Sequence, residues 1–84
     1  MIFVDTGAWF ACIVPSDPNH SAATRWLQAN SSSLLTTDYV IDETLTLLKS
    51  RGHFARAAAF GEELFEKQKC DTSLKVLQQK DRSW

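Results

Sequence analysis

The sequence has no run of apolar residues close to the roughly 20 that span a bilayer, and no basic segment precedes its first apolar run. We therefore expect a soluble, unsecreted, cytoplasmic protein. Its two cysteines, Cys12 and Cys70, form no CxxC or Cys/His pattern. This spacing argues against a disulfide framework and a zinc site, and favours reduced thiols in the core.

An excess of charge is also lacking, because nine Lys and Arg stand against ten Asp and Glu. The resulting net charge of −1 gives no global attraction to nucleic acid or anionic lipid, so any contact with nucleic acid must be local. The sequence contains neither a GxSxG elbow nor a Walker loop, and it has no internal repeat. These absences exclude the serine-hydrolase and P-loop nucleotide-binding patterns and the repeat folds.

The composition itself is that of a globular protein, with 44% hydrophobic and 23% charged residues. A chain of 84 residues makes one domain at most, spanning residues 1–84. Short apolar segments predict strands at residues 2–4, 34–36 and 72–77. The first strand is apolar throughout, which is typical of a strand buried on both faces.

Helical patterns fill the intervals between these segments. The first predicted helix is capped by Asp5 or Thr6 and stops at Pro15, and the second runs from near His20 to the polar cluster 30–33. A third begins around residues 37–38, where Thr37 or Asp38 can cap, with Gly52 as its C′ residue, and a fourth covers 54–67. Strands alternating with helices predict an α/β fold with a parallel sheet and flanking helices.

In the second and fourth predicted helices, apolar residues recur at helical spacing along one face, and this face is expected to pack against the rest of the protein. In the second helix the stripe contains Trp26, which we expect in the core. The stripe of the fourth helix consists of Phe54, Ala57, Ala58, Gly61, Leu64 and Phe65. Trp9 and Phe10 of the first helix are open between the core and a surface that stacks on nucleic-acid bases or binds a partner helix.

Asp5 ends the first strand, where a charge beside a core is costly unless something balances it. The carboxyl ends of parallel strands share one edge of the sheet, so Asp38, Asp42 or Glu43 of the third helix can approach Asp5. Two carboxylates sharing a site favour either a raised pKa or a hard divalent cation. Mg²⁺ or Mn²⁺ is the natural candidate.

Among the three acids, helical geometry favours Glu43, because it shares a partly core-directed face with Tyr39, Val40, Thr46 and Leu47. Asp38 has the position of a cap residue, and Asp42 falls between faces. The competing interpretation is purely structural. An aspartate that ends a strand commonly caps the next helix, and acids in the first turns of a helix suit its dipole.

Two segments, IFVDTGAWFACIVPSDPNHSAA and LLTTDYVIDETLTLLKSR, closely resemble PIN-domain proteins, in particular VapC-type toxins of toxin–antitoxin pairs. The resemblance implies a three-layer α/β/α fold and a metal-dependent endoribonuclease, a hydrolase of RNA phosphodiester bonds. It implies that Asp5 and Glu43 are catalytic and bind Mg²⁺ or Mn²⁺, and that Thr6 helps to orient the site. It also implies an RNA substrate and a cognate antitoxin protein as partners.

One part of the family pattern is missing, namely the later strand-to-helix segment that often reads like SFTDC. Asp71 and Asp81 do not have its setting. We therefore expect a single, incomplete PIN-like domain that is truncated after the third strand and lacks its C-terminal third. A fragment, a truncated gene and a protein completed by a second chain are the three explanations.

This incompleteness predicts impaired nuclease activity, and it predicts a dimer or higher oligomer, because an open sheet edge and an uncovered apolar face favour self-association. The alternative function is a catalytically inactive PIN-like module for interaction or dimerisation. Of the remaining residues, His20 and His53 are expected to face solvent. Lys49, Arg51 and Arg56 either hold phosphates or are solvated helix ends.

Overall fold

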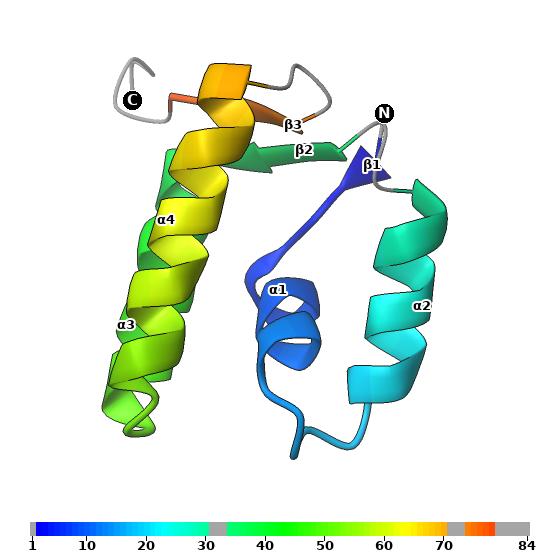
Figure 1. Cartoon of the computed structure of the whole chain (residues 1–84), viewed down its shortest axis with the longest axis vertical. Coiled ribbons are helices and arrows are strands. Elements are labelled where there is room, and N and C mark those ends of the chain that lie inside the picture. The colour runs from blue at the N-terminus through cyan, green and yellow to red at the C-terminus, as the bar shows by residue number, and fades with distance from the viewer. Residues whose placement is uncertain (1, 31–33, 71–73, 79–84) are drawn as a thin grey trace, which may run out of the picture.

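The computed structural model describes residues 2–30, 34–70 and 74–78. Its helices and strands alternate along the chain as the sequence predicts (Figure 1). In chain order they are β1 (Ile2–Phe3), α1 (Thr6–Ile13), α2 (His20–Asn30), β2 (Leu34–Thr37), α3 (Asp38–Ser50), α4 (Phe54–Cys70) and β3 (Leu74–Leu77). Residues 72–73 of the third predicted strand lie outside the described residues, as do Asp71 and Asp81.

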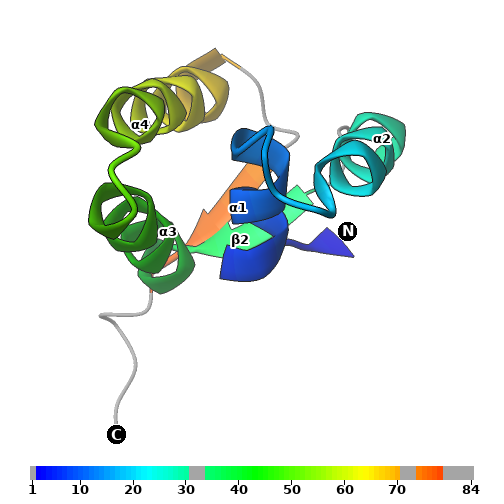
Figure 2. The same ribbon diagram turned by 90° about the horizontal axis from the view of Figure 1, so that it is seen from below.

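The three strands form a parallel sheet in the order β1-β2-β3. Leu34 in the middle strand is in register with Ile2 on one side and Leu74 on the other. Both connections between strands run through a helix pair, and the four helices lie on the same side of the sheet (Figures 1 and 2). The parallel sheet with flanking helices is thus confirmed, and the described residues supply the sheet and one helical layer.

Burial alternates along β3, and from Phe3 to Val4, because successive side chains point to opposite faces of a sheet. Val4, Leu34 and Leu74 are buried beneath the helices. Phe3 is 50% exposed and Leu77 is also exposed. The prediction that the first strand is buried on both faces is therefore wrong for Phe3, because in the described part of the chain the helices cover only the opposite face.

The core lies between the sheet and helices α1, α3 and α4. Its central aromatic contact joins Trp9 of α1 to Phe60 of α4, with ring centroids 5.3 Å apart and planes tilted by 59°. The two helices that carry these rings come from different strand connections. Their packing therefore ties the first crossover to the second.

Local signals set both ends of α3. The Thr37 hydroxyl accepts a hydrogen bond from the Val40 N–H at 3.1 Å, so Thr37 is the N-cap and Asp38 belongs to the first turn. Of the two residues that the sequence offers as a cap, the structure selects Thr37 and not Asp38. At the other end Gly52 has a φ of 81°, as predicted for a C′ residue. The N–H groups of Gly52 and His53 bond the carbonyls of Lys49 and Leu48, which closes a Schellman motif.

Helices α2 and α4 differ from their predicted packing. Trp26 of α2 is 38% exposed, because this helix packs on α1 at the margin of the fold (Figure 2). In α4 the buried stripe is Ala57, Phe60 and Leu64, whereas the predicted members Phe54 and Phe65 are exposed. Across the described ranges, no helix is both long and apolar enough to cross a membrane.

Candidate active site

Asp5 lies directly after β1, at the edge of the sheet where the strands end. It is the N-cap of α1, and its Oδ1 accepts a hydrogen bond of 2.9 Å from the Ala8 N–H. The carboxylate is nevertheless exposed. The cap engages one oxygen, and the second oxygen remains for a ligand.

Glu43 reaches this edge from the second turn of α3. Its Oε1 accepts a hydrogen bond of 2.6 Å from the hydroxyl of Thr6, the residue after Asp5. That length is typical of a hydroxyl donating to a carboxylate. The bond joins residues 37 positions apart, so the structure brings Asp5, Thr6 and Glu43 together at the sheet edge. Their roles as catalytic residues and metal ligands stay a prediction.

The rotation of α3 that presents Glu43 is set by its buried stripe, which consists of Val40, Thr44 and Leu48. The predicted core-directed face was wrong in detail, because Tyr39 and Glu43 are both exposed. Thr44 was overlooked because it is polar. Its hydroxyl donates to the Val40 carbonyl at 2.7 Å, and a polar group satisfied in this way is tolerated in a core.

A buried hydrogen-bond chain lies behind Asp5. The indole Nε1 of Trp9 donates to the Thr36 hydroxyl at 3.3 Å, and this hydroxyl donates to the carbonyl of Val4 at 3.0 Å. Thr36 has no exposed surface. Of the roles left open for Trp9, the structure selects the core, and the chain of bonds fixes the backbone that immediately precedes Asp5.

Asp42 is exposed on the helix beside Glu43. No group of three or more His, Cys, Asp or Glu side chains able to hold a metal occurs within residues 2–30, 34–66 and 74–78. The candidate site in this part of the chain therefore consists of two carboxylates and one hydroxyl.

Histidines and arginines near the helix ends have structural contacts instead. The His20 Nδ1 lies 2.8 Å from the Ala11 carbonyl and links α2 to α1, so its predicted solvent-facing position is wrong. The His53 ring packs edge-on against the Phe10 ring, with centroids 6.2 Å apart, and the guanidinium carbon of Arg51 lies over the Phe10 ring, 5.9 Å from its centroid. These contacts occupy the loop end of α1 and α3, away from the strand ends.

Cys12 is half-buried in α1, and desolvation raises the pKa of its thiol. A raised pKa leaves less of the reactive thiolate at neutral pH. Cys12 is therefore a packing residue rather than a nucleophile.

Comparisons with known proteins agree with this arrangement. Residues 2–80 match the PIN domain. Over 60 residues, 70% of this chain, the sequence is 42% identical to the "23S rRNA-specific endonuclease VapC20" of Mycobacterium tuberculosis, in strain CDC 1551 / Oshkosh and in strain ATCC 25618 / H37Rv. These matches cover 46% of each relative, so the chain spans about half the length of the curated proteins it matches.

A solved structure gives the same result at the level of the fold. The crystal structure of M. tuberculosis VapC20, described as a "Sarcin-Ricin loop cleaving toxin", superposes with a TM-score of 0.76 and 28% sequence identity. The superposition covers 93% of this chain and 56% of that one. The described sheet and helices therefore correspond to part of that toxin's fold.

Proposed function

The chain belongs to the PIN-domain family, and from its strand-end carboxylates we propose that it is a metal-dependent endoribonuclease of the VapC toxin type, acting in the cytoplasm. The observation that carries the proposal is the 2.6 Å hydrogen bond from Thr6 to Glu43, which ties the acid of α3 to the residue that follows Asp5. The likeness to VapC20, named as a 23S rRNA-specific endonuclease, supports RNA as the substrate class. A cognate antitoxin is the expected protein partner.

The donor atoms fit a hard divalent cation, because Asp5, Glu43 and Thr6 offer only oxygen. Mg²⁺ is usually held by one or two carboxylates, with waters and substrate phosphates completing its octahedral shell. We propose that Asp5 and Glu43 bind Mg²⁺ or Mn²⁺ in this way. When bound, such an ion lowers the pKa of an attacking water and offsets the charge that develops on the phosphate.

Each protein group has a separate task in this scheme. Asp5 is held by its bond to the Ala8 N–H, so its free oxygen keeps a fixed position relative to the sheet edge. Thr6 uses its hydroxyl to orient the Glu43 carboxylate, whose long side chain would otherwise sample several rotamers. The exposure of both carboxylates leaves them accessible to a strand of RNA.

A second candidate function is a catalytically inactive PIN-like module that binds a partner or dimerises. It is favoured by one observation, namely that within the described residues no third acidic side chain joins the two carboxylates. The two functions predict opposite results in a cleavage assay. They also differ in metal binding, which the inactive module does not need.

The test is cleavage of RNA by this chain with Mg²⁺ or Mn²⁺, alongside calorimetric titration of Mn²⁺. We expect weak cleavage that Asp5→Asn and Glu43→Gln each abolish, together with a loss of Mn²⁺ affinity of about tenfold or more. Asp42→Asn is the matched control, because Asp42 is exposed and adjacent to Glu43 on the same helix. Equal loss in the control would refute the site, and absence of both cleavage and Mn²⁺ binding would favour the inactive module.

A further inference from the structure

Tyr39 is an exposed aromatic residue in the first turn of α3, four residues before Glu43. Its side chain is 62% exposed. Within the described residues its ring and hydroxyl make no hydrogen bond, ion pair or ring contact. Packing in the core therefore does not account for an aromatic ring at this position.

The rotation of α3 places Tyr39 on the flank of the helix that carries Glu43. Val40 and Thr44 are buried, and the residues directly before them, Tyr39 and Glu43, are exposed. Side chains four residues apart lie on the same side of a helix, with Cβ atoms about 5–6 Å apart. This flank faces α1, because Glu43 accepts its hydrogen bond from Thr6 and the two helices pack together (Figure 2). Tyr39 therefore emerges beside Glu43 at the edge where β2 ends.

Charge at this edge of the sheet does not supply a binding surface for RNA phosphates. The acids that begin or precede α1 and α3 are Asp5, Asp38, Asp42 and Glu43. Helix α1 contains no Lys or Arg, and the one basic residue of α3, Lys49, is in its last turn. The described strands contain one basic residue, Lys75, which lies two residues before the end of β3. Phosphates that are not in contact with a bound cation are repelled by the acids, so RNA needs a contact here that is not an ion pair.

An exposed aromatic ring provides a contact of this kind. Aromatic side chains stack on the faces of unpaired bases, and each such stack strengthens binding about fivefold to a hundredfold. The interaction requires no positive charge on the protein, because every base has a π-face. The Tyr39 ring is already accessible, so stacking on it requires no rearrangement of the fold.

From this geometry we propose that Tyr39 binds RNA by stacking on one unpaired base, next to the phosphate that lies at Asp5 and Glu43. This inference rests on the proposed function and extends it by a substrate-binding residue. Stacking uses the ring, so the hydroxyl of Tyr39 is not required. The metal is bound by the carboxylates, so its affinity does not depend on Tyr39.

The experiment measures binding of a fluorescently labelled, unpaired RNA oligonucleotide to the whole chain by fluorescence anisotropy, with Mn²⁺ present. We expect Tyr39→Ala to raise the dissociation constant of the RNA about fivefold or more, and Tyr39→Phe to leave it near that of the unmodified chain. Gel electrophoresis of the recovered RNA verifies that it stays intact during the measurement. Mn²⁺ titration of Tyr39→Ala should give the affinity of the unmodified chain.

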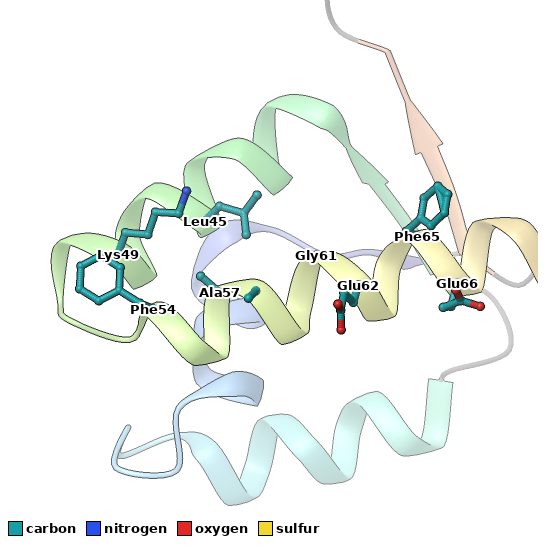
Figure 3. A pocket seen from close by; sticks show the side chains of 9 residues that line it. Leu45, Lys49, Phe54, Ala57, Gly61, Glu62, Phe65 and Glu66 are labelled. Carbon is teal, nitrogen blue, oxygen red and sulfur yellow. The ribbon is translucent and has the colours of Figure 1, made fainter.

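Phe54→Ala is the matched control, because Phe54 is 66% exposed and also lies in the first turn of a helix. It lines a groove between α3 and α4 together with Lys49, at the end of α3 opposite to Tyr39 (Figure 3). Its removal should leave RNA affinity unchanged. Thermal unfolding of Tyr39→Ala excludes misfolding as a cause, since the side chain is exposed and alanine is the better helix former.

Removal of single bases from the RNA tests the stacking contact itself. With the unmodified chain, one abasic position should weaken binding about fivefold or more. The same abasic RNA should lose little further affinity for Tyr39→Ala, because the ring that stacks on this base is already missing. A structural role of Tyr39 would not produce this dependence on one base.

The outcomes separate the stacking contact from the proposed nuclease. RNA affinity that ignores Tyr39→Ala, or the lack of an abasic position that depends on it, would overturn the stacking contact and leave the metal site standing. A chain that binds no RNA would overturn it as well. Binding of RNA that depends on Tyr39, in a chain that neither cleaves RNA nor binds Mn²⁺, would support the stacking contact and refute the nuclease.

Discussion

Two threonine hydroxyls lie on either side of Asp5, and their surroundings are opposite. Behind Asp5, the Thr36 hydroxyl is fully buried and takes part in two hydrogen bonds, from Trp9 and to the Val4 carbonyl. In front of it, the Thr6 hydroxyl makes a single bond to the exposed Glu43. The Thr36 hydroxyl fixes the backbone at the end of β1. The Thr6 hydroxyl orients the Glu43 carboxylate at the same edge of the sheet.

This difference indicates that the stability of the fold and the geometry of the candidate site depend on two different hydroxyl groups near Asp5. A buried polar group is costly when it loses its partner, because water cannot replace the lost bond. An exposed group has water as a substitute, so losing its partner costs little stability and changes mainly the orientation of the neighbouring carboxylate. Stability should therefore depend on Thr36 and site geometry on Thr6.

The largest expected effect on stability comes from Thr36→Val, which keeps the side-chain shape and removes the hydroxyl. The Trp9 indole N–H and the Val4 carbonyl both lose a buried partner, so we expect the free energy of unfolding to fall by about 2–4 kcal/mol. Urea unfolding followed by tryptophan fluorescence measures it. Thr36→Ser, which retains the hydroxyl, should recover part of the loss, and equal losses in the two variants would contradict the assignment.

A smaller effect is expected at Asp5, which combines a helix cap with a candidate metal ligand. Asp5→Ala removes the cap of α1 and should lower the free energy of unfolding by about 0.5–2 kcal/mol. Asp5→Asn retains an oxygen that can accept from the Ala8 N–H, so its stability should stay near that of the unmodified chain while Mn²⁺ binding is lost. Measuring unfolding and Mn²⁺ titration on both variants separates the two roles. If Asp5→Asn is as unstable as Asp5→Ala, the cap depends on the charge rather than on the oxygen.

The sequence predicts well what short-range chemistry determines. The strand at the N-terminus, the caps at Asp5 and Thr37, and Gly52 at the end of α3 all follow from residues within a few positions of one another. Helical geometry favoured Glu43 as the partner of Asp5, and the resemblance to PIN domains supported this choice. In the structure Glu43 bonds Thr6, the residue after Asp5. The helix face on which the choice rested was wrong in detail, because Tyr39 and Glu43 are both exposed.

The sequence fails where the outcome depends on packing between distant segments. Trp9 and Thr36 are 27 positions apart, and neither residue type signals the bond that joins them. Helix α4 carries apolar residues on two faces, so its periodicity could not tell that Phe60 faces the core while Phe54 and Phe65 do not. His20 was misjudged for a related reason, since its partner is the carbonyl of Ala11 in a different helix.

The smallest effect on stability should come from Thr6→Val, although it removes the contact that carries the proposed site. Both Thr6 and Glu43 are accessible to water, so we expect the free energy of unfolding to change by less than about 0.5 kcal/mol. Glu43 should become more mobile, however, and Mn²⁺ affinity should fall about threefold to tenfold, with Thr6→Ser close to the unmodified chain because it keeps the hydroxyl. Parallel titration of the two variants tests this. A strong loss of stability in Thr6→Val, with Mn²⁺ affinity unchanged, would show that Thr6 acts like Thr36, and the contrast between the two hydroxyls would disappear.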